Sequence, residues 1–131
     1  MNLGDALDAV GRLLEARDAY GKAVELARIE LSKEFNAQTA GMMAKSQAKL
    51  GLSADAEQSA MKAFTAKETD FEVVYKVAAV YALTGQPEKA LEKLERAVKL
   101  GKPLWEVRAD RDLRSLRNNP RFKNLVAESG R

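Results

Sequence analysis

The chain has 131 residues, a formal net charge of +3 at neutral pH, and no histidine or cysteine. Its length fits a single domain, and the missing residue types exclude disulfides, thiolate nucleophiles, the usual zinc sites and the commonest general base. Because no segment approaches the ~18 apolar residues of a membrane span and the start lacks the basic and apolar regions of a signal peptide, we expect a cytoplasmic protein without membrane contact.

Residues 1–36 carry apolar or small side chains at helical spacing. These are Leu3, Leu7, Ala16, Tyr20 and Ala23. We expect Gly11 to end a short first helix and a second helix to run from Arg12 to near Phe35. Asp5 and Asp8 lie three residues apart in the first helix, and two interpretations stay open for them: a groove surface or a solvated helix start.

Residues 37–70 and 71–102 are two copies of one pattern. A shift of 34 residues places Gly51 under Gly85 and Ala63 under Ala97. Gly85 suits the left-handed conformation that ends a helix, and Pro87 suits the first turn of the next helix. Each copy therefore predicts two amphipathic helices joined by a tight turn, and the fixed period predicts a solenoid. From Gly11 to Gly51 the step is forty, so we expect about six extra residues in the helix after Gly11.

This pattern resembles the tetratricopeptide repeat, in which a Leu-Gly or Leu-Ala pair, aromatic residues, a turn glycine and alanines recur in a fixed order. The matching residues are Leu3-Gly4, Tyr20, Met43-Ala44, Val77-Ala78, Tyr81, Gly85, Ala90 and Ala97. The second repeat departs from the pattern, with Gln47 and Ala60 at the two aromatic places. An ordinary alanine-rich helical bundle is the alternative, but it does not predict a turn glycine at the period.

The resemblance implies an all-α fold, an α-α superhelix of about three helix pairs with a C-terminal cap. The expected parts of this single domain are a truncated first repeat (1–36), a second repeat (37–70), a third repeat (71–102) and the cap (103–131). If Gly4 occupies the eighth position of its repeat, the first four positions precede Met1, so we expect a piece of a longer protein.

Residues 103–131 do not repeat the pattern, and residues 101–131 carry 8 Lys/Arg against 4 Asp/Glu. They resemble the segment that closes groups of such repeats in many bacterial kinases, cyclases and transcriptional regulators. The matching residues are Leu104, Trp105, Arg108-Ala109-Asp110, Asp112-Leu113, Leu116-Arg117 and Asn119-Pro120-Arg121-Phe122. Asn119 before Pro120 predicts a helix start, and the following apolar face predicts a cap on the last repeat.

The residues that could support chemistry are few. Asp110 and Asp112 are the best candidates for acid–base work or Mg²⁺ binding, but Arg111 between them favours helix capping and arginine pairing. No glycine-rich phosphate loop or serine nucleophile motif is present. We therefore expect no enzyme, no cofactor and no metal site. The basic tail does not favour nucleic acid either, because its aspartates interleave with the arginines, and Trp105 and Phe122 fall where the cap needs core.

The resemblance implies a protein-protein interaction scaffold that binds a peptide in its concave groove. The candidate groove residues are Gln38, Met42, Lys45, Lys49, Glu72, Tyr75 and Lys76. The three lysines form a basic centre that would suit an acidic or amphipathic segment, although each could be an ordinary solvated charge. We expect this scaffold to belong to a larger bacterial signalling or regulatory protein. The alternative is a structural module that associates with copies of itself.

Overall fold

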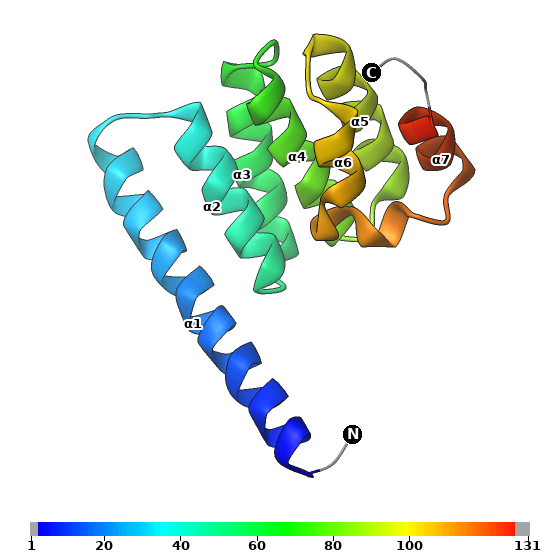
Figure 1. The fold of residues 1–131 in the computed structure, drawn as a ribbon. Coiled ribbons are helices and arrows are strands. Elements are labelled where there is room, and N and C mark those ends of the chain that lie inside the picture. Colours follow the sequence, from blue (N-terminus) through cyan, green and yellow to red (C-terminus); the bar gives the residue numbers. More distant parts are fainter. Residues whose placement is uncertain (1–2, 128–131) are drawn as a thin grey trace.

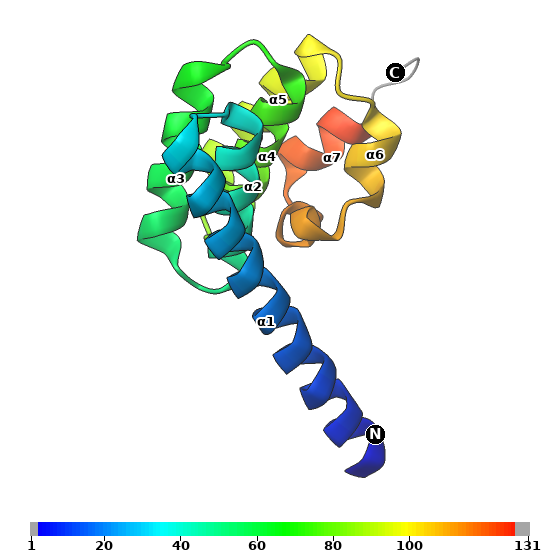
Figure 2. The ribbon, with the colours of Figure 1, turned by 90° about the vertical axis from the view of Figure 1, so that its left-hand side faces the viewer.

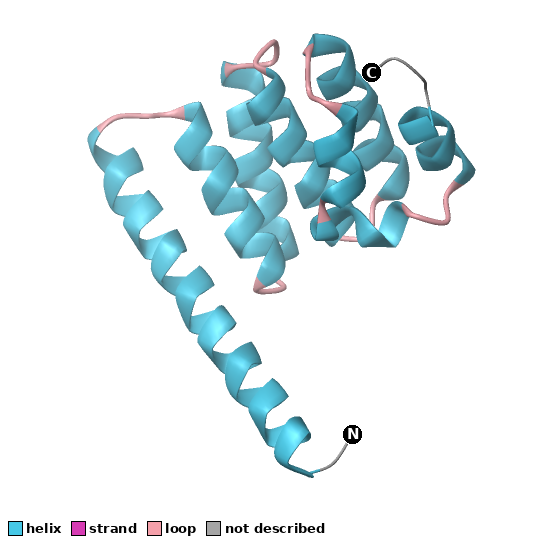
Figure 3. Cartoon of the chain, in the orientation of Figure 1, coloured by secondary structure: helices cyan, strands magenta, loops and turns pink. Residues whose placement is uncertain are grey.

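The computed structural model describes residues 3–127, with side chains from Val10 onward. Seven α-helices and one 3-10 helix follow one another in this part of the chain (Figure 1). Their bounds are α1 Leu3–Lys33, α2 Ala37–Lys49, α3 Ser53–Ala66, α4 Phe71–Leu83, α5 Pro87–Leu100, α6 Leu104–Ala109, η1 Arg111–Leu116 and α7 Pro120–Ala127. Residues 3–127 contain no strand, which confirms the all-α prediction (Figure 3). None of these helices is long and apolar enough to cross a membrane.

The helix pairs α2–α3 and α4–α5 have the same turn. Gly51 and Gly85 end the first helix of each pair with φ of 82° and 75°, a conformation that glycine adopts without a steric penalty. After each glycine the next amide reaches back across the turn to a carbonyl of the preceding helix, at 2.9 Å: Leu52 to Gln47, and Gln86 to Tyr81. The turns expected at these two glycines are therefore present.

Helix α4 lies at the centre of the core and contacts α2, α3, α5 and η1. Small residues such as Ala60 and Ala78 are fully buried and allow the helices to approach closely. Leu91 and Leu94 of α5 are also fully buried. Each such leucine stabilises the fold by roughly 1.5–3 kcal/mol. The two pairs stack side by side as an α-α superhelix.

Helix α1 differs from the sequence-based expectation. It is one continuous helix, and the expected turn at Gly11 is absent. The C-terminal half packs along α2, with Val24 and Ala27 buried, whereas the N-terminal half extends away from the other helices (Figures 1 and 2). The prediction of two helices in residues 1–36 was therefore wrong for the described residues. The physical reason is that no neighbouring helix packs against the segment before Gly11 and forces it to fold back.

The segment α6–η1–α7 covers the end of the α4–α5 pair. Its apolar side chains join the main core: Leu104, Val107, Leu113, Leu116, Phe122 and Leu125 are all buried. Asn119 accepts a hydrogen bond from the Arg121 amide at 2.9 Å and so begins α7, as its sequence predicts. Trp105 is different: it is 66% exposed, so its predicted place in the core is wrong.

Candidate functional site

Two lysines of α2 share one carboxylate of the closing segment. Lys45 and Lys49 are four residues apart, so their side chains lie on the same face of α2. Their Nζ atoms lie 2.7 and 3.2 Å from the carboxylate oxygens of Asp112 in η1. Burial alone would raise the pKa of Asp112, but the hydrogen bonds and charges of the two lysines outweigh it and hold this pKa below its ordinary value. The expected basic centre is thus partly neutralised.

The sequence predicts helix capping and arginine partners for Asp110 and Asp112, but the partners in the structure are not arginines. Asp110 accepts a hydrogen bond from the Asp112 amide at 2.9 Å and begins η1, so its capping role is present. Its other oxygen accepts a hydrogen bond from the Tyr75 hydroxyl at 2.6 Å. The partners of Asp112 are lysines. Among the side chains that the structure describes, from Val10 to Ala127, no group of three or more acidic ones could hold a metal ion.

Lys76 of α4 carries the third charge of the expected basic centre. Its Nζ donates to the Gln38 side-chain oxygen at 3.3 Å, and the Gln38 amide nitrogen donates to Asp70 at 3.3 Å. Burial is the main cause that lowers the pKa of Lys76, and the nearby charge of Lys45 adds to it. Lys76 forms no ion pair within the described residues, but the nearby charges of Glu72 and Asp70 partly oppose the lowering of its pKa.

Glu72 and Tyr75 are engaged inside the molecule. The Lys102 Nζ lies 3.0 Å from a Glu72 oxygen and 4.2 Å from the centre of the Tyr75 ring. Tyr75 is only 7% exposed, and burial together with the hydrogen bond to Asp110 raises its pKa. Tyr75 thus joins α4 to the closing segment through Asp110, and Glu72 joins α4 to Lys102, which directly precedes that segment.

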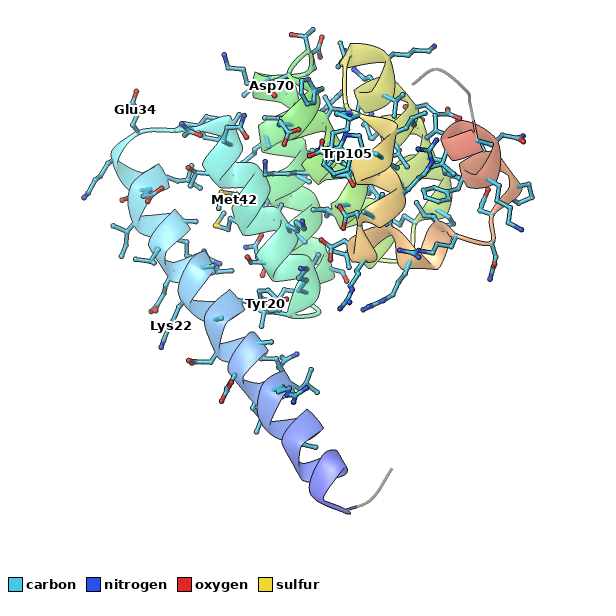
Figure 4. All side chains as sticks on the ribbon, viewed as in Figure 1. Tyr20, Lys22, Glu34, Met42, Asp70 and Trp105 are labelled. Atoms are coloured by element: carbon cyan, nitrogen blue, oxygen red, sulfur yellow. The ribbon has the colours of Figure 1, made fainter. Side chains whose placement is uncertain are left out.

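A groove of about 540 Å³ lies between α1 and α2. It is lined by Tyr20, Ala23, Leu26, Ala27 and Glu30 of α1, by Thr39, Met42, Lys45, Ser46 and Lys49 of α2, and by Lys76 of α4. Leu26 and Met42 present exposed apolar side chains, at 63% and 59%. Figure 4 shows Met42 and Tyr20 between the two helices. This volume is within the range of ligand-binding clefts, and its apolar wall has a basic rim.

Four of the seven predicted groove residues line this groove: Met42, Lys45, Lys49 and Lys76. Gln38 lines a smaller neighbouring pocket of about 200 Å³. The groove residues predicted from the sequence did not include Tyr20 and Leu26 of α1. The extra length expected in the helix after Gly11 could have indicated them, because a longer helix exposes more surface beside α2. The Lys49 Nζ lies 5.0 Å from the centre of the Tyr20 ring. The side chains of Asp5 and Asp8 lie outside the described part of the structure.

The basic tail also has internal partners. Arg121 binds both carboxylate oxygens of Glu95, at 2.9 and 2.6 Å. This hydrogen bonding lowers the pKa of Glu95. The Arg108 guanidinium donates to the Val126 carbonyl. These arginines therefore attach α7 to α5 and α6.

Comparison with protein families finds the tetratricopeptide repeat at residues 1–30. The start of the chain is therefore similar to a tetratricopeptide repeat. The matched segment coincides with most of α1, where the structure shows a single helix and not a pair. No curated protein and no solved structure matches the chain.

Proposed function

We propose that this protein binds an acidic or amphipathic helical segment of another protein in the groove between α1 and α2. Tetratricopeptide repeats are in general protein–protein interaction modules. The observation that carries the finer proposal is the pairing of exposed Leu26 and Met42 with a lysine rim in one helix-sized groove.

The charges of the groove favour an acidic ligand. Its lining contains three lysines and one carboxylate, Glu30. Lys45 and Lys49 together carry two positive charges and share the single negative charge of Asp112. The remaining positive charge of this pair and the charge of Lys76 would attract an acidic ligand. Such complementarity increases the association rate and fixes orientation more than it adds affinity. The affinity would come from covering Leu26 and Met42.

We propose that the protein acts by binding and catalyses no reaction. We also propose a regulatory or signalling role within a longer cytoplasmic bacterial protein. The support for this part is the resemblance of residues 103–131 to closing segments of bacterial multidomain proteins.

Synthetic helical peptides of equal length and apolar content, with net charge varied from acidic to basic, test the proposal by fluorescence polarisation. Acidic amphipathic peptides should bind best. Met42→Ser should weaken their binding about tenfold, because the substitution removes an apolar contact. Met61→Ser is the matched control, since Met61 is 58% exposed on α3 and does not line the groove. Absence of binding, or equal binding by both variants, would contradict the proposal.

A further inference from the structure

Gly11 occupies the place of the turn glycine in the repeat pattern, but it lies inside one continuous helix. At the corresponding place Gly51 and Gly85 have positive φ and end a helix, whereas Gly11 is inside α1. No atom lies within 4 Å of a side chain built at Gly11, so close packing does not explain a glycine there. Glycine in a helix interior costs about 1 kcal/mol relative to alanine. The segment before Gly11 therefore has the sequence of a first helix, although its backbone continues into the rest of α1.

The groove is the place where such a first helix is missing. Helix α4 packs against α2, and its Val73 and Val80 are completely buried. The residues of α2 that correspond to them by the 34-residue period are Thr39 and Ser46, which line the groove and are only half-buried. Helix α4 packs on both helices of the preceding repeat, α2 and α3, whereas among the described residues α2 packs on one preceding helix, α1. The groove thus has the position of an α-helix.

The segment that fits this place by charge is the start of α1. Residues 3–10 contain two aspartates and no lysine or arginine. Leu3, Leu7 and Val10 recur at helical spacing, so the segment is an acidic amphipathic helix. Farther along, Leu13 and Leu14 are 61% and 63% exposed. We call residues 3–14 the arm. With Asp5, Asp8 and Arg12 its net charge is −1, and its acidic start and apolar residues complement the lysine-rimmed groove.

The arm does not lie in the groove of its own copy. Helix α1 is continuous from Leu3 to Lys33, and its residues 20–30 form one wall of the groove, so the arm extends away from α2 along the same helix (Figures 1 and 2). The arm of another copy is not held in this direction.

We propose that two copies of the chain pair by reciprocal exchange, each placing its arm in the groove between α1 and α2 of the other. This two-fold arrangement is closed, and each groove is completed by the partner copy. The pairing uses the groove of the proposed function, so a peptide ligand and the second copy compete for it. Self-association itself requires no other protein.

Sedimentation equilibrium of the chain alone over a concentration series tests the pairing. We expect a monomer–dimer equilibrium. The double variant Val10→Lys with Leu14→Lys should weaken it about a hundredfold, because two apolar contacts are lost and charge repulsion with the groove lysines is added. Ile29→Lys is the control: Ile29 is 53% exposed, like Val10, lies on α1 and does not line the groove. A monomer at every concentration, or a dimer that the double variant leaves unchanged, would overturn the proposal.

Disulfide cross-linking tests the arrangement of the two copies. The chain contains no cysteine, so any disulfide must form between the introduced cysteines. A mixture of the single variants Val10→Cys and Leu26→Cys should give a mixed disulfide between the two chains when oxidised. Val10→Cys mixed with Met61→Cys should not. If the second mixture cross-links as well as the first, the arm does not lie in the groove. Peptide binding by a chain that stays monomeric would reject the pairing and leave the proposed function intact.

Discussion

At the scale of single residues, Gln47 and Ser59 form a polar pair in the interior between α2 and α3. Gln47 is 2% exposed, and the Ser59 hydroxyl donates to its side-chain oxygen at 2.7 Å. Gln47 occupies the place where the repeat pattern has an aromatic residue. The loss of aromatic packing at this place is offset in part by a buried hydrogen bond.

Ser59→Ala should destabilise the protein by about 1–3 kcal/mol, because it leaves the Gln47 oxygen buried without its donor. The double variant Gln47→Leu with Ser59→Ala should recover most of this loss, since both polar groups are then removed. Urea unfolding of the wild type, both single variants and the double variant measures the interaction. Additive losses in the double variant would show that the pair is not coupled.

The lysine pair on Asp112 makes stability depend on pH. The pKa of Asp112 is below its ordinary value in the folded state, so its contribution is present above the unfolded pKa of about 3.9 and is lost as pH falls through the folded pKa. Asp112→Asn should therefore lower the unfolding free energy by about 1 kcal/mol at neutral pH, and the difference should disappear in acid. Thermal unfolding between neutral and acid pH measures it.

Asp18→Asn is the control for this pH series. Asp18 lies 3.1 Å from Lys22, but both side chains are about 70% exposed, so its loss should change stability little at any pH. A pH-independent effect of Asp112→Asn would mean that its carboxylate is not stabilised by the two lysines.

The candidate site was predictable only in part at this scale. The positions of Met42, Lys45 and Lys49 on one helix follow from local spacing, which the sequence shows directly. The contact of the lysines with Asp112 does not, because η1 lies in the segment that has no repeat, and a period cannot place it. The exposure of Trp105 was not predicted either, because α6 also lies in the segment without a repeat. Leu104 and Val107 of this short helix are buried in the core in place of Trp105.

At the scale of elements, the pairs α2–α3 and α4–α5 were predictable because glycine, proline and apolar spacing agree at the same period. Gly11 shows the limit of such local signals. A glycine permits a turn without requiring one, and the turn forms only where the two helices it joins cover each other. That condition is tertiary, so the sequence pattern around Gly11 could not distinguish a helix pair from the continuous α1.

Alanine substitutions should distinguish a glycine that forms a turn, Gly85, from a glycine inside a continuous helix, Gly11. Gly85→Ala should destabilise the protein by about 1 kcal/mol or more, because φ is 75° there. Gly11→Ala should instead stabilise α1 by about 1 kcal/mol, because its backbone is already helical. Helicity from circular dichroism and thermal unfolding measure both effects. Gly21→Ala is the control, since Gly21 is also inside α1 with no atom near a side chain built there. Destabilisation by Gly11→Ala alone would indicate that the turn forms in solution.

At the scale of the whole molecule, burial is concentrated at α4 and is low in residues 10–19 of α1. Residues 73–82 of α4 are almost all buried, whereas Val10, Leu13 and Leu14 are more than half exposed. Because each repeat contacts only its neighbours, local opening should be easiest at the exposed end. Native-state hydrogen exchange should therefore be slowest in α4 and fastest in residues 10–19.

Native-state hydrogen exchange measured at two protein concentrations also tests self-association. If the arm of a second copy fills the groove, exchange in residues 10–19 should slow as concentration rises, because dimer formation suppresses opening of the arm by mass action. Exchange in α4 should not change, since its amides are protected within one copy. Equal slowing in both segments would instead indicate a general effect of concentration. No slowing in residues 10–19 would mean that α1 keeps an exposed start in every copy.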